Sequence, residues 1–204
     1  MHVAPIASST ALGLVVQHHY LHRRTSVVFS FGLFAAEQIV GVVTFGVPAA
    51  RHLQIGAGPS DPDAVLELNR LWVSDAMPRN SESWFLSRAL ALLPARIIVS
   101  YADTTRGHMG IVYRAANFRY AGWTDMERKT PRFDYITPGK HTRDAFRGGL
   151  GTKSPRVRRK PKVKYWIVTG NPTERRALLK LARWPTLSWK QNPPPTEHKT
   201  LDLP

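Results

Sequence analysis

Residues 66–103, LELNRLWVSDAMPRNSESWFLSRALALLPARIIVSYAD, decide the fold of this chain. Apolar and polar residues alternate over 66–73, which is the pattern of a half-buried strand. A turn with several possible N-cap residues follows, and apolar residues at helical spacing then predict a helix over 83–93 that Pro94 ends. The run 96–102 is apolar and has the length of a buried strand. Strand, helix and strand in this order predict a layered arrangement of helices on a sheet.

The flanking segments extend this layer in both directions. The β-branched and aromatic runs 27–34 and 39–46 predict an antiparallel hairpin. Hydroxyl residues at 8–10 precede a helical pattern that reaches His22, whereas 51–63 has the composition of a loop. Beyond residue 103 we expect a helix over 109–117, a strand over 118–123, a strand over 163–169 and a helix over 175–184. The expected fold class is α/β (α+β), with a central mixed sheet flanked by helices and a basic C-terminal extension.

Positive charge is concentrated toward the C-terminus. The chain holds 29 Lys and Arg against 14 Asp and Glu, a formal net charge of +15. Residues 140–190 include 15 basic and 2 acidic residues, so this stretch supplies +13 and the remainder +2. Such a block predicts a nucleic acid partner, with a solvated, solubilising surface as the alternative. The expected phosphate-binding residues are Arg156, Arg158, Arg159, Lys160, Lys162 and Lys164, near four aromatic residues that could stack on an extruded base, Tyr165, Trp166, Trp184 and Trp189.

The length of 204 residues is enough for one substantial core. We expect a core domain over 1–127, a basic flexible segment over 128–162, a strand and helix over 163–190 that complete the core and the DNA-binding arm, and a disordered tail over 191–204. The sequence has no cysteine, which excludes disulfides and cysteine-based metal sites. No apolar run approaches the ~20 residues of a membrane-spanning helix, and no secretory signal is evident, so we expect a soluble intracellular protein.

The segment QHHYLH at 17–22 is the first candidate site. On a continued helix, His18 and His22 would share one face at a spacing that could chelate a metal. His19 could move a proton near neutral pH, and Tyr20 could donate a hydrogen bond to a developing anion. A polar helix end whose histidines face solvent or cap carbonyls is the alternative, and spacing alone favours it.

Three further candidates lie at the ends of expected elements. Asp103 follows a buried strand, where open α/β sheets bind ligands; burial would raise its pKa and suit a general base, while capping of the next loop is an equal alternative. Tyr113 offers a phenol on a helix, although core packing is the usual role of a lone tyrosine. The turn 78–83 could bind an anion at a helix start, with Ser83 adding a hydroxyl, but it lacks pyrophosphate-loop glycines, so helix capping is the simpler interpretation.

In this order, the segments resemble a GNAT-type acyltransferase core and, more narrowly, the Mom DNA-modification proteins of Mu-like bacteriophages. The resemblance spans roughly 18–123 and rests on six blocks: HHYLHR at 18–23, TFGVP at 44–48, ELNRLWV at 67–73, NSES at 80–83, SYAD at 100–103 and GHMGIVYRA at 107–115. Each block alone is unspecific, and it is their common order that carries the resemblance.

The resemblance implies a phage enzyme that adds a carbamoylmethyl (acetamido) group to N6 of adenine in double-stranded DNA and so blocks restriction, in the cytoplasm of the bacterial host. Carried over by position, its functional residues are His19, Tyr20, Arg70, Ser83, Asp103 and Tyr113. Asn80, Ser81 and Ser83 stand where acetyltransferases bind the cofactor pyrophosphate. Because the glycines of that loop are missing, binding of acetyl-CoA in the usual manner is not implied, and the donor stays open. Iron is implied as a further cofactor, with His19, Asp103 and Tyr113 as candidate ligands.

Two other functions fit the same residues. An acyl-CoA-dependent N-acetyltransferase of a small amine or protein would bind CoA phosphates at the turn 80–83. A non-catalytic DNA-binding protein would share the salt dependence of DNA affinity. The oligomeric state and the base context of the target adenine stay open.

Overall fold

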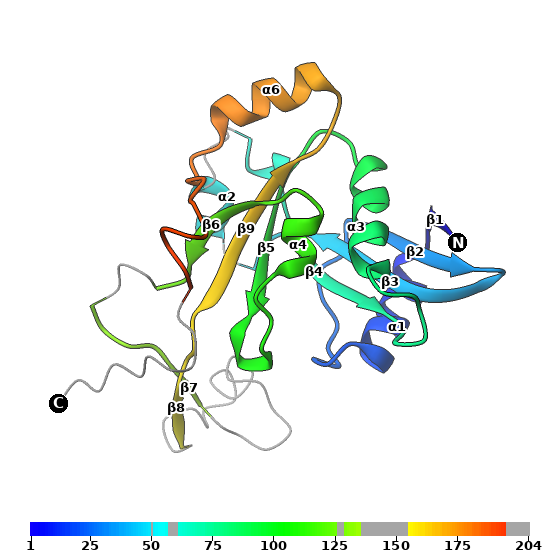
Figure 1. The fold of residues 1–204 in the computed structure, drawn as a ribbon, viewed down its shortest axis with the longest axis horizontal. Coiled ribbons are helices and arrows are strands. Elements are labelled where there is room, and N and C mark those ends of the chain that lie inside the picture. The colour runs from blue at the N-terminus through cyan, green and yellow to red at the C-terminus, as the bar shows by residue number, and fades with distance from the viewer. Residues whose placement is uncertain (50, 57–60, 126–128, 136–154, 195–204) are drawn as a thin grey trace.

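In the computed structural model, helices cover both faces of a seven-stranded sheet (Figure 1). The structure describes residues 1–49, 51–56, 61–125, 129–135 and 155–194. The strands are β1 (His2–Pro5), β2 (Phe29–Ala35), β3 (Gln38–Gly46), β4 (Val65–Val73), β5 (Ile97–Asp103), β6 (Arg119–Trp123), β7 (Phe133–Tyr135), β8 (Arg156–Arg158) and β9 (Lys162–Val168). The helices are α1 (Ser8–His18), α2 (Arg51–Gly56), α3 (Ser81–Ala91), α4 (Ile111–Ala115) and α6 (Pro172–Leu181). None of these described helices combines the length and apolar character needed to cross a bilayer.

The strand order is β1-β2-β3-β4-β5-β9-β6. β4 and β5 pair in parallel, and the other described neighbours pair antiparallel. A parallel pair requires a crossover connection, which α3 supplies between the two strands. β9 returns late in the chain to lie between β5 and β6. The expected fold class, a mixed sheet flanked by helices, is confirmed.

Each face of the sheet is covered by its own helices. α3 contributes Phe85, Leu86, Ala89 and Leu90 to the main core, together with Ile98 of β5. On the opposite face, α6 packs over Ile97 and Val99 of β5, and α1 packs over Val42 of β3. β5 is therefore apolar on both sides, which explains why its sequence is a continuous apolar run rather than an alternating one.

A bulge at Asn69 in β4 changes the direction of the side chains that follow it. Thr44 of β3 pairs with Arg70 and Phe45 with Leu68, so Asn69 is the additional residue. Its side chain accepts a hydrogen bond from the Thr44 hydroxyl (2.6 Å) and donates one to the Ser26 carbonyl (2.8 Å). Because a bulge shifts the two-residue alternation, Arg70 leaves the α3 face of the sheet and lies on the α1 face.

Several expectations about the N-terminal half need correction. The helix expected to reach His22 ends at His18, so His18 and His22 do not share a helical face. His18 stacks on Trp72 (ring centroids 4.3 Å apart), and Nδ1 of His22 donates to the Val16 carbonyl (2.9 Å). The segment 51–63, expected to be a loop, contains α2 and a short 3₁₀ turn. The edge strand β1 was not predicted.

The C-terminal half also differs from the expectation of irregular chain. Within the segment 128–162, β7 and β8 form a two-stranded antiparallel sheet, here called the basic hairpin. The beginning of the expected tail packs on the fold, because the Tyr120 hydroxyl donates to the Asn192 carbonyl (2.7 Å). Residues 195–204 of that tail lie outside the described residues.

Candidate active site

The candidate active site lies where the two parallel strands part. β4 and β5 pair from Val65 opposite Ile97 to Leu68 opposite Ser100, and no pairing joins these described strands beyond that point although both continue. The carboxyl ends of parallel strands are the usual ligand-binding edge of such sheets. Asn69, the bulge residue of β4, lies on one side of this gap, and Asp103, the last residue of β5, lies on the other side.

Asp103 is a charged carboxylate with its oxygens already engaged. Its Oδ1 accepts hydrogen bonds from the Thr105 amide (3.1 Å) and hydroxyl (2.6 Å), and Lys162 Nζ lies 3.5 Å from its Oδ2. Burial raises the pKa of Asp103, but the Thr105 hydrogen bonds and the Lys162 charge outweigh burial and hold the pKa below its ordinary value. The expectation of a raised pKa is therefore wrong. The alternative prediction, that Asp103 caps the next loop, is confirmed, because Asp103 is the N-cap of the 3₁₀ turn that follows.

His19 follows the last residue of α1 and is only 7% exposed. Burial, helped by the charges of Arg70 and His108, lowers its pKa to about 4, so the ring is neutral at pH 7. Its Nδ1 accepts a hydrogen bond from the Leu21 amide (3.2 Å), which places the proton of the neutral ring on Nε2. His19 therefore offers a hydrogen-bond donor to the site rather than a base.

The Tyr20 phenol links the members of the site. Its ring stacks on His19, with centroids 4.4 Å apart. Burial, together with the nearby Asp103 carboxylate and Tyr113, raises the pKa of Tyr20 to about 12 although Arg70 and Arg106 act in the opposite direction. Tyr20 is therefore protonated at physiological pH and can donate a hydrogen bond.

Arg70 is the least well satisfied polar group in the described structure. Its Nη1 donates to the Asn69 carbonyl (2.6 Å), while its buried Nε has no hydrogen-bond partner among the described residues. Burial lowers the pKa of Arg70, and Tyr20 and Glu67 act in the opposite direction. A buried, unsatisfied N–H costs roughly 1–3 kcal/mol, a penalty that proteins retain most often at functional sites.

Tyr113 reaches the site from the α3 face of the sheet. Its ring packs between those of Phe118 and Tyr165, with centroid distances of 5.4 Å to each. Burial raises the pKa of Tyr113, while a hydrogen bond with Ser100 acts in the opposite direction. The structure thus shows the core packing expected of a lone tyrosine, and also brings the hydroxyl to the end of the β4–β5 pairing.

The turn before α3 lines one end of a pocket that follows this helix to its last turn. Asn80 and Ser83 line a cavity of about 390 Å³ that also includes Trp84 and Arg88. Asn80 adopts a left-handed conformation (φ 71°) and makes no side-chain cap. Ser81 does not belong to this cavity: it is buried and its hydroxyl donates to the Pro78 carbonyl (2.7 Å), so its expected ligand contact is wrong.

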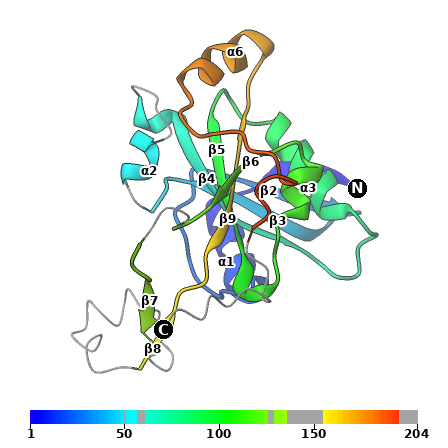
Figure 2. The ribbon, with the colours of Figure 1, turned by 60° about the vertical axis from the view of Figure 1, so that its left-hand side comes forward.

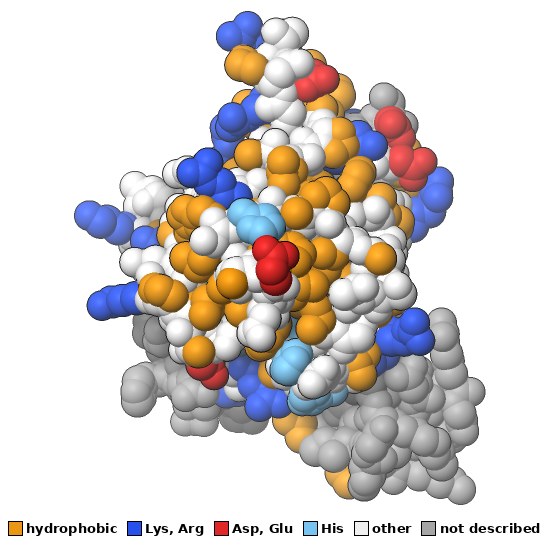
Figure 3. Space-filling model, turned by 90° about the vertical axis from the view of Figure 1, so that its right-hand side faces the viewer, with side chains coloured by type: hydrophobic (Ala, Val, Ile, Leu, Met, Phe, Trp, Pro, Cys, Tyr) orange, Lys and Arg blue, Asp and Glu red, His pale blue; other side chains and the backbone are white. Residues whose placement is uncertain are grey.

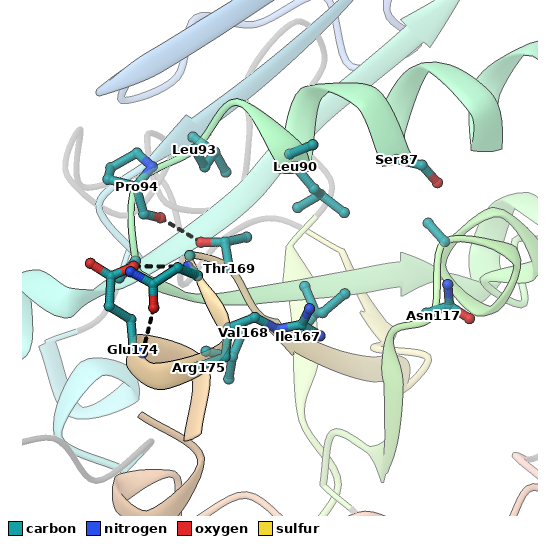
Figure 4. Close-up of a pocket in the computed structure, with 15 residues that line it drawn as sticks. Ser87, Leu90, Leu93, Pro94, Asn117, Ile167, Val168, Thr169, Glu174 and Arg175 are labelled. Atoms are coloured by element: carbon teal, nitrogen blue, oxygen red, sulfur yellow. Dashed lines mark hydrogen bonds between the residues drawn. The ribbon is translucent and has the colours of Figure 1, made fainter. Parts of the chain in front are cut away.

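A second, larger cavity of about 640 Å³ lies toward the C-terminal end of α3, where Ser87 and Ala91 line both cavities (Figure 4). Its lining includes the apolar Leu90 and Leu93 and the polar Asn117 and Arg175. None of the residues carried over by the resemblance lines it. The larger cavity is therefore not part of the candidate active site.

The structure divides the expected phosphate-binding residues into two groups. Arg156 and Arg158 are exposed on β8, with Arg156 stacked on Phe133 (4.6 Å). Arg159 forms a two-pronged ion pair with Asp134, and Lys162 pairs with Asp103, so both already hold an acidic partner. Lys160 is exposed, and Lys164 is half-buried within β9.

Two of the aromatic residues expected to stack on a base are not available for it. Tyr165 is fully buried and Trp166 is 3% exposed, so both belong to the core. Trp184 packs edge-on against Tyr101, and Trp189 contacts Tyr120. The stacking expectation is therefore wrong for Tyr165 and Trp166, whose apolar strand context favours burial.

Sequence reasoning missed three groups at the site. Arg106 lies over the Tyr20 ring (5.6 Å), and His108 meets its edge (centroids 5.6 Å apart). Both are exposed on the loop that follows β5. Glu67 acts electrostatically on both Arg70 and Tyr113. Arg106 and His108 could have been found from their position in the sequence, because they follow the strand that ends at Asp103.

The iron site that the resemblance implies at His19, Asp103 and Tyr113 stays a prediction. No three His, Asp or Glu side chains come together among the described parts of the chain. Of the three candidate iron ligands, Asp103 is paired with Lys162, and His19 has only Nε2 unengaged, as a donor. Asp103 and Nδ1 of His19 thus already have partners within the protein.

The depressed pKa of His19 predicts a pH dependence of stability. The unfolded chain binds a proton at His19 below about pH 6.5, whereas the folded chain does so only below about pH 4. The contribution of His19 to the free energy of unfolding is therefore at its full value above pH 6.5 and decreases as the pH falls toward 4. We expect the melting temperature of the wild type to fall between pH 7 and 5 by more than that of His19→Gln, as measured by circular dichroism. Parallel curves for the two proteins would contradict the assignment.

Known proteins are similar to this chain in sequence and in structure. A curated relative, "Methylcarbamoylase mom" of Escherichia phage Mu, is 31% identical over 132 residues, which cover 60% of this chain and 54% of that protein. The match thus spans about half the length of the curated relative. Among solved structures, a Bacillus subtilis acetyltransferase in complex with CoA aligns with a TM-score of 0.45 at 10% identity, covering 82% of this chain and 97% of that one. A GNAT-like decarboxylase in complex with isobutyryl-CoA aligns with a TM-score of 0.46 at 16% identity, covering 81% and 98%.

The family comparison covers most of the chain. Residues 1–169 match the family model of the Mom protein family. The matched region includes every strand of the seven-stranded sheet and each of His19, Tyr20, Arg70, Asp103 and Tyr113. The chain therefore belongs to the Mom protein family.

Proposed function

We propose that this protein modifies DNA by transferring a carbamoylmethyl group to N6 of adenine in the double-stranded DNA of a phage, in the cytoplasm of its bacterial host, and so protects the DNA from restriction. Membership of the Mom protein family supports the proposal. The name of the Mu relative, a methylcarbamoylase, supports the group transferred. The charge of the chain supports a polyanionic substrate.

The observation that carries the proposal is the junction between the basic hairpin and the site. Lys162 begins β9 four positions after the end of β8, and its ammonium lies 3.5 Å from the Asp103 carboxylate. The Pro161 carbonyl accepts a hydrogen bond from the Thr104 hydroxyl (2.6 Å), which fixes the same junction to the loop after β5. The hairpin lies at the carboxyl end of β5 (Figure 1). DNA held by the hairpin would thus lie next to Asp103.

The chemistry requires the adenine to leave the base stack. N6 of a paired adenine is not accessible to a side chain, and extrusion costs a few kcal/mol. The cations Arg156 and Arg158 would hold phosphates, since both are exposed on β8. Tyr20 is a half-exposed aromatic residue beside Asp103, and Arg106 and His108 lie around its ring. Tyr20 would contact the extruded base.

The transfer itself is a displacement at carbon. N6 attacks the terminal carbon of the two-carbon group, the N–C bond forms, and the bond from that carbon to the leaving group of the donor breaks. The N6 proton passes to Oδ2 of Asp103, since Oδ1 already accepts two hydrogen bonds from Thr105 whereas Oδ2 has the Lys162 ammonium at 3.5 Å. The Tyr20 hydroxyl, the Nε2–H of His19 and the Arg70 guanidinium are donors that would stabilise negative charge on the donor molecule.

The pocket at the start of α3 is where we place the donor. It adjoins the first turn of a helix, whose amides favour anionic groups, and Asn80 and Ser83 line it. The same pocket is the specific observation that supports the second candidate function, an acyl-CoA-dependent N-acetyltransferase. Titration calorimetry with CoA separates the two, because the acetyltransferase requires saturable CoA binding that the DNA-modification proposal does not.

Mass spectrometry of nucleosides tests the proposed function directly. DNA from cells that express the protein is digested to nucleosides, and we expect a heavier adenine nucleoside whose added mass is that of a carbamoylmethyl group. DNA from cells with an empty vector provides the control. Unmodified adenine in DNA from cells that contain soluble protein would refute the proposal.

A further inference from the structure

The cationic stretch 140–190 is continuous in the sequence but divided in space. β9 runs antiparallel to β5 over its whole length, from Lys162 opposite Asp103 to Val168 opposite Ile97. At about 3.3 Å per residue, this strand holds the chain segments at its two ends ~20 Å apart. Figures 1 and 2 show the basic hairpin and α6 at opposite ends of the fold. The charge therefore forms two surfaces rather than one arm.

Several cations near the hairpin already have acidic partners, whereas those of α6 have none among the described residues. Arg175, Arg176 and Lys180 are exposed on α6, and Arg183 is exposed just after it. No ion pair of the described structure involves any of these four. In the hairpin region, by contrast, Arg132, Arg159 and Lys162 pair with Asp125, Asp134 and Asp103, respectively. The α6 cations thus keep their full charge for an external partner.

α6 is a fixed platform for these charges. Asn171 accepts hydrogen bonds from the Thr173 and Glu174 amides, and the Glu174 carboxylate accepts one from the Asn171 amide. This capping box occupies the one acidic side chain of the helix. The apolar side of α6 packs on the sheet through Leu178 and Leu179. Arg176 and Lys180 lie four residues apart, hence on one side of the helix.

The face of the molecule in Figure 3 shows that positive charge is not spread evenly. Its centre is largely apolar, with one acidic side chain and a histidine, and Lys and Arg side chains lie toward its periphery. General solubility does not require four unpaired cations on one short segment. Unpaired guanidinium and ammonium groups on a rigid surface match the phosphates of a nucleic acid backbone.

We infer that the outward face of α6, with Arg176, Lys180 and Arg183, is a second DNA-binding surface that holds phosphates away from the base being modified. The inference rests on the proposed function for the identity of its partner. It assigns α6 a share of DNA affinity and no share of the chemistry, because α6 lies at the opposite end of β9 from Asp103.

The test compares Arg176→Gln/Lys180→Gln with the wild type on a 30-base-pair duplex, by fluorescence anisotropy at several salt concentrations. Each lost phosphate contact reduces the salt slope by about 0.9, so the double variant should lose about 1.8. Raising the salt from 50 to 200 mM lowers the DNA affinity of both proteins, and the factor of this decrease should be about 12 times smaller for the double variant than for the wild type. At saturating DNA, the rate of adenine modification should be unchanged.

A matched control removes two exposed cations elsewhere. Arg51→Gln/Arg79→Gln has the same net charge as the α6 variant and should keep the wild-type slope. An unchanged slope in the α6 variant, or an equal loss in the control, would overturn the inference; the first result would assign the face to another, acidic partner. If the wild type binds DNA with the expected slopes but modifies no adenine, the proposed function fails and the second surface stands.

Discussion

Asp103→Asn is expected to lower the rate of adenine modification by about 100- to 10,000-fold, the usual contribution of a general base. The amide keeps the shape of the side chain and its oxygen can still accept the Thr105 hydrogen bonds, but it cannot take the N6 proton. The ion pair with Lys162 is half-exposed on the lysine side, so its loss costs at most about 1 kcal/mol of stability. The measurement is single-turnover modification of a duplex, followed by mass spectrometry.

Two controls separate chemistry from binding. Asp75→Asn removes an equal charge from an exposed position and should leave the rate unchanged. DNA affinity of Asp103→Asn, measured at fixed salt, should stay within about twofold of the wild type, because no phosphate contact is removed. A variant that loses affinity in proportion to its rate would show that Asp103 serves DNA binding, and a variant with the wild-type rate would remove Asp103 from the mechanism.

Gly110→Ala is expected to destabilise the fold by about 2–5 kcal/mol. Gly110 precedes α4 with φ +76°, a conformation that costs Ala about 1–2 kcal/mol. A Cβ atom there would also lie 2.6 Å from Cζ and 2.8 Å from the hydroxyl oxygen of Tyr165. The Tyr165 ring is fully buried and its hydroxyl donates to the Met109 carbonyl (2.6 Å), so it has no room to move. Such overpacking adds about 1–3 kcal/mol.

Gly107→Ala measures the conformational part of this effect alone, so the difference between the two variants gives the steric part. Gly107 has nearly the same backbone conformation (φ +72°), but no atom lies within 4 Å of the position its Cβ would take. It should lose only the conformational cost of about 1–2 kcal/mol, measured by urea denaturation. Equal losses in the two variants would contradict the contact between Gly110 and Tyr165. Because Tyr113 packs on Tyr165, we also expect Gly110→Ala to lower the modification rate of the folded fraction.

The central layer of this fold could be predicted from the sequence because its signals are local. The apolar run of β5 is buried on both faces, and the helix ended by Pro94 is present as α3. Asn171 and Glu174 form the capping box that their spacing predicted, with Pro172 at the first helical position. The position of Asp103 at the end of a strand could be predicted in the same way, because the length and the apolar content of a strand are visible in a single segment.

Features that depend on distant segments could not be predicted. The bulge at Asn69 is held by Thr44 and Ser26, and no local pattern in β4 indicates it. The helical pattern through His22 gave no sign that α1 ends at His18, whose ring stacks on Trp72 of β4. Part of the lowering of the Asp103 pKa comes from Lys162, a partner that only the antiparallel register of β9 brings close.

The place of β9 in the sheet has a consequence for biosynthesis. β6 hydrogen-bonds to β9 and to no other described strand, and residues 124–161 leave the ribosome between the two. At 5–20 residues per second, translation of that interval takes roughly 2–8 s. Throughout this delay β5 presents an open edge, the kind of surface that recruits chaperones or neighbouring nascent chains. A polypeptide released before residue 168 would keep that edge permanently, so premature termination in this gene should yield insoluble rather than partly active product.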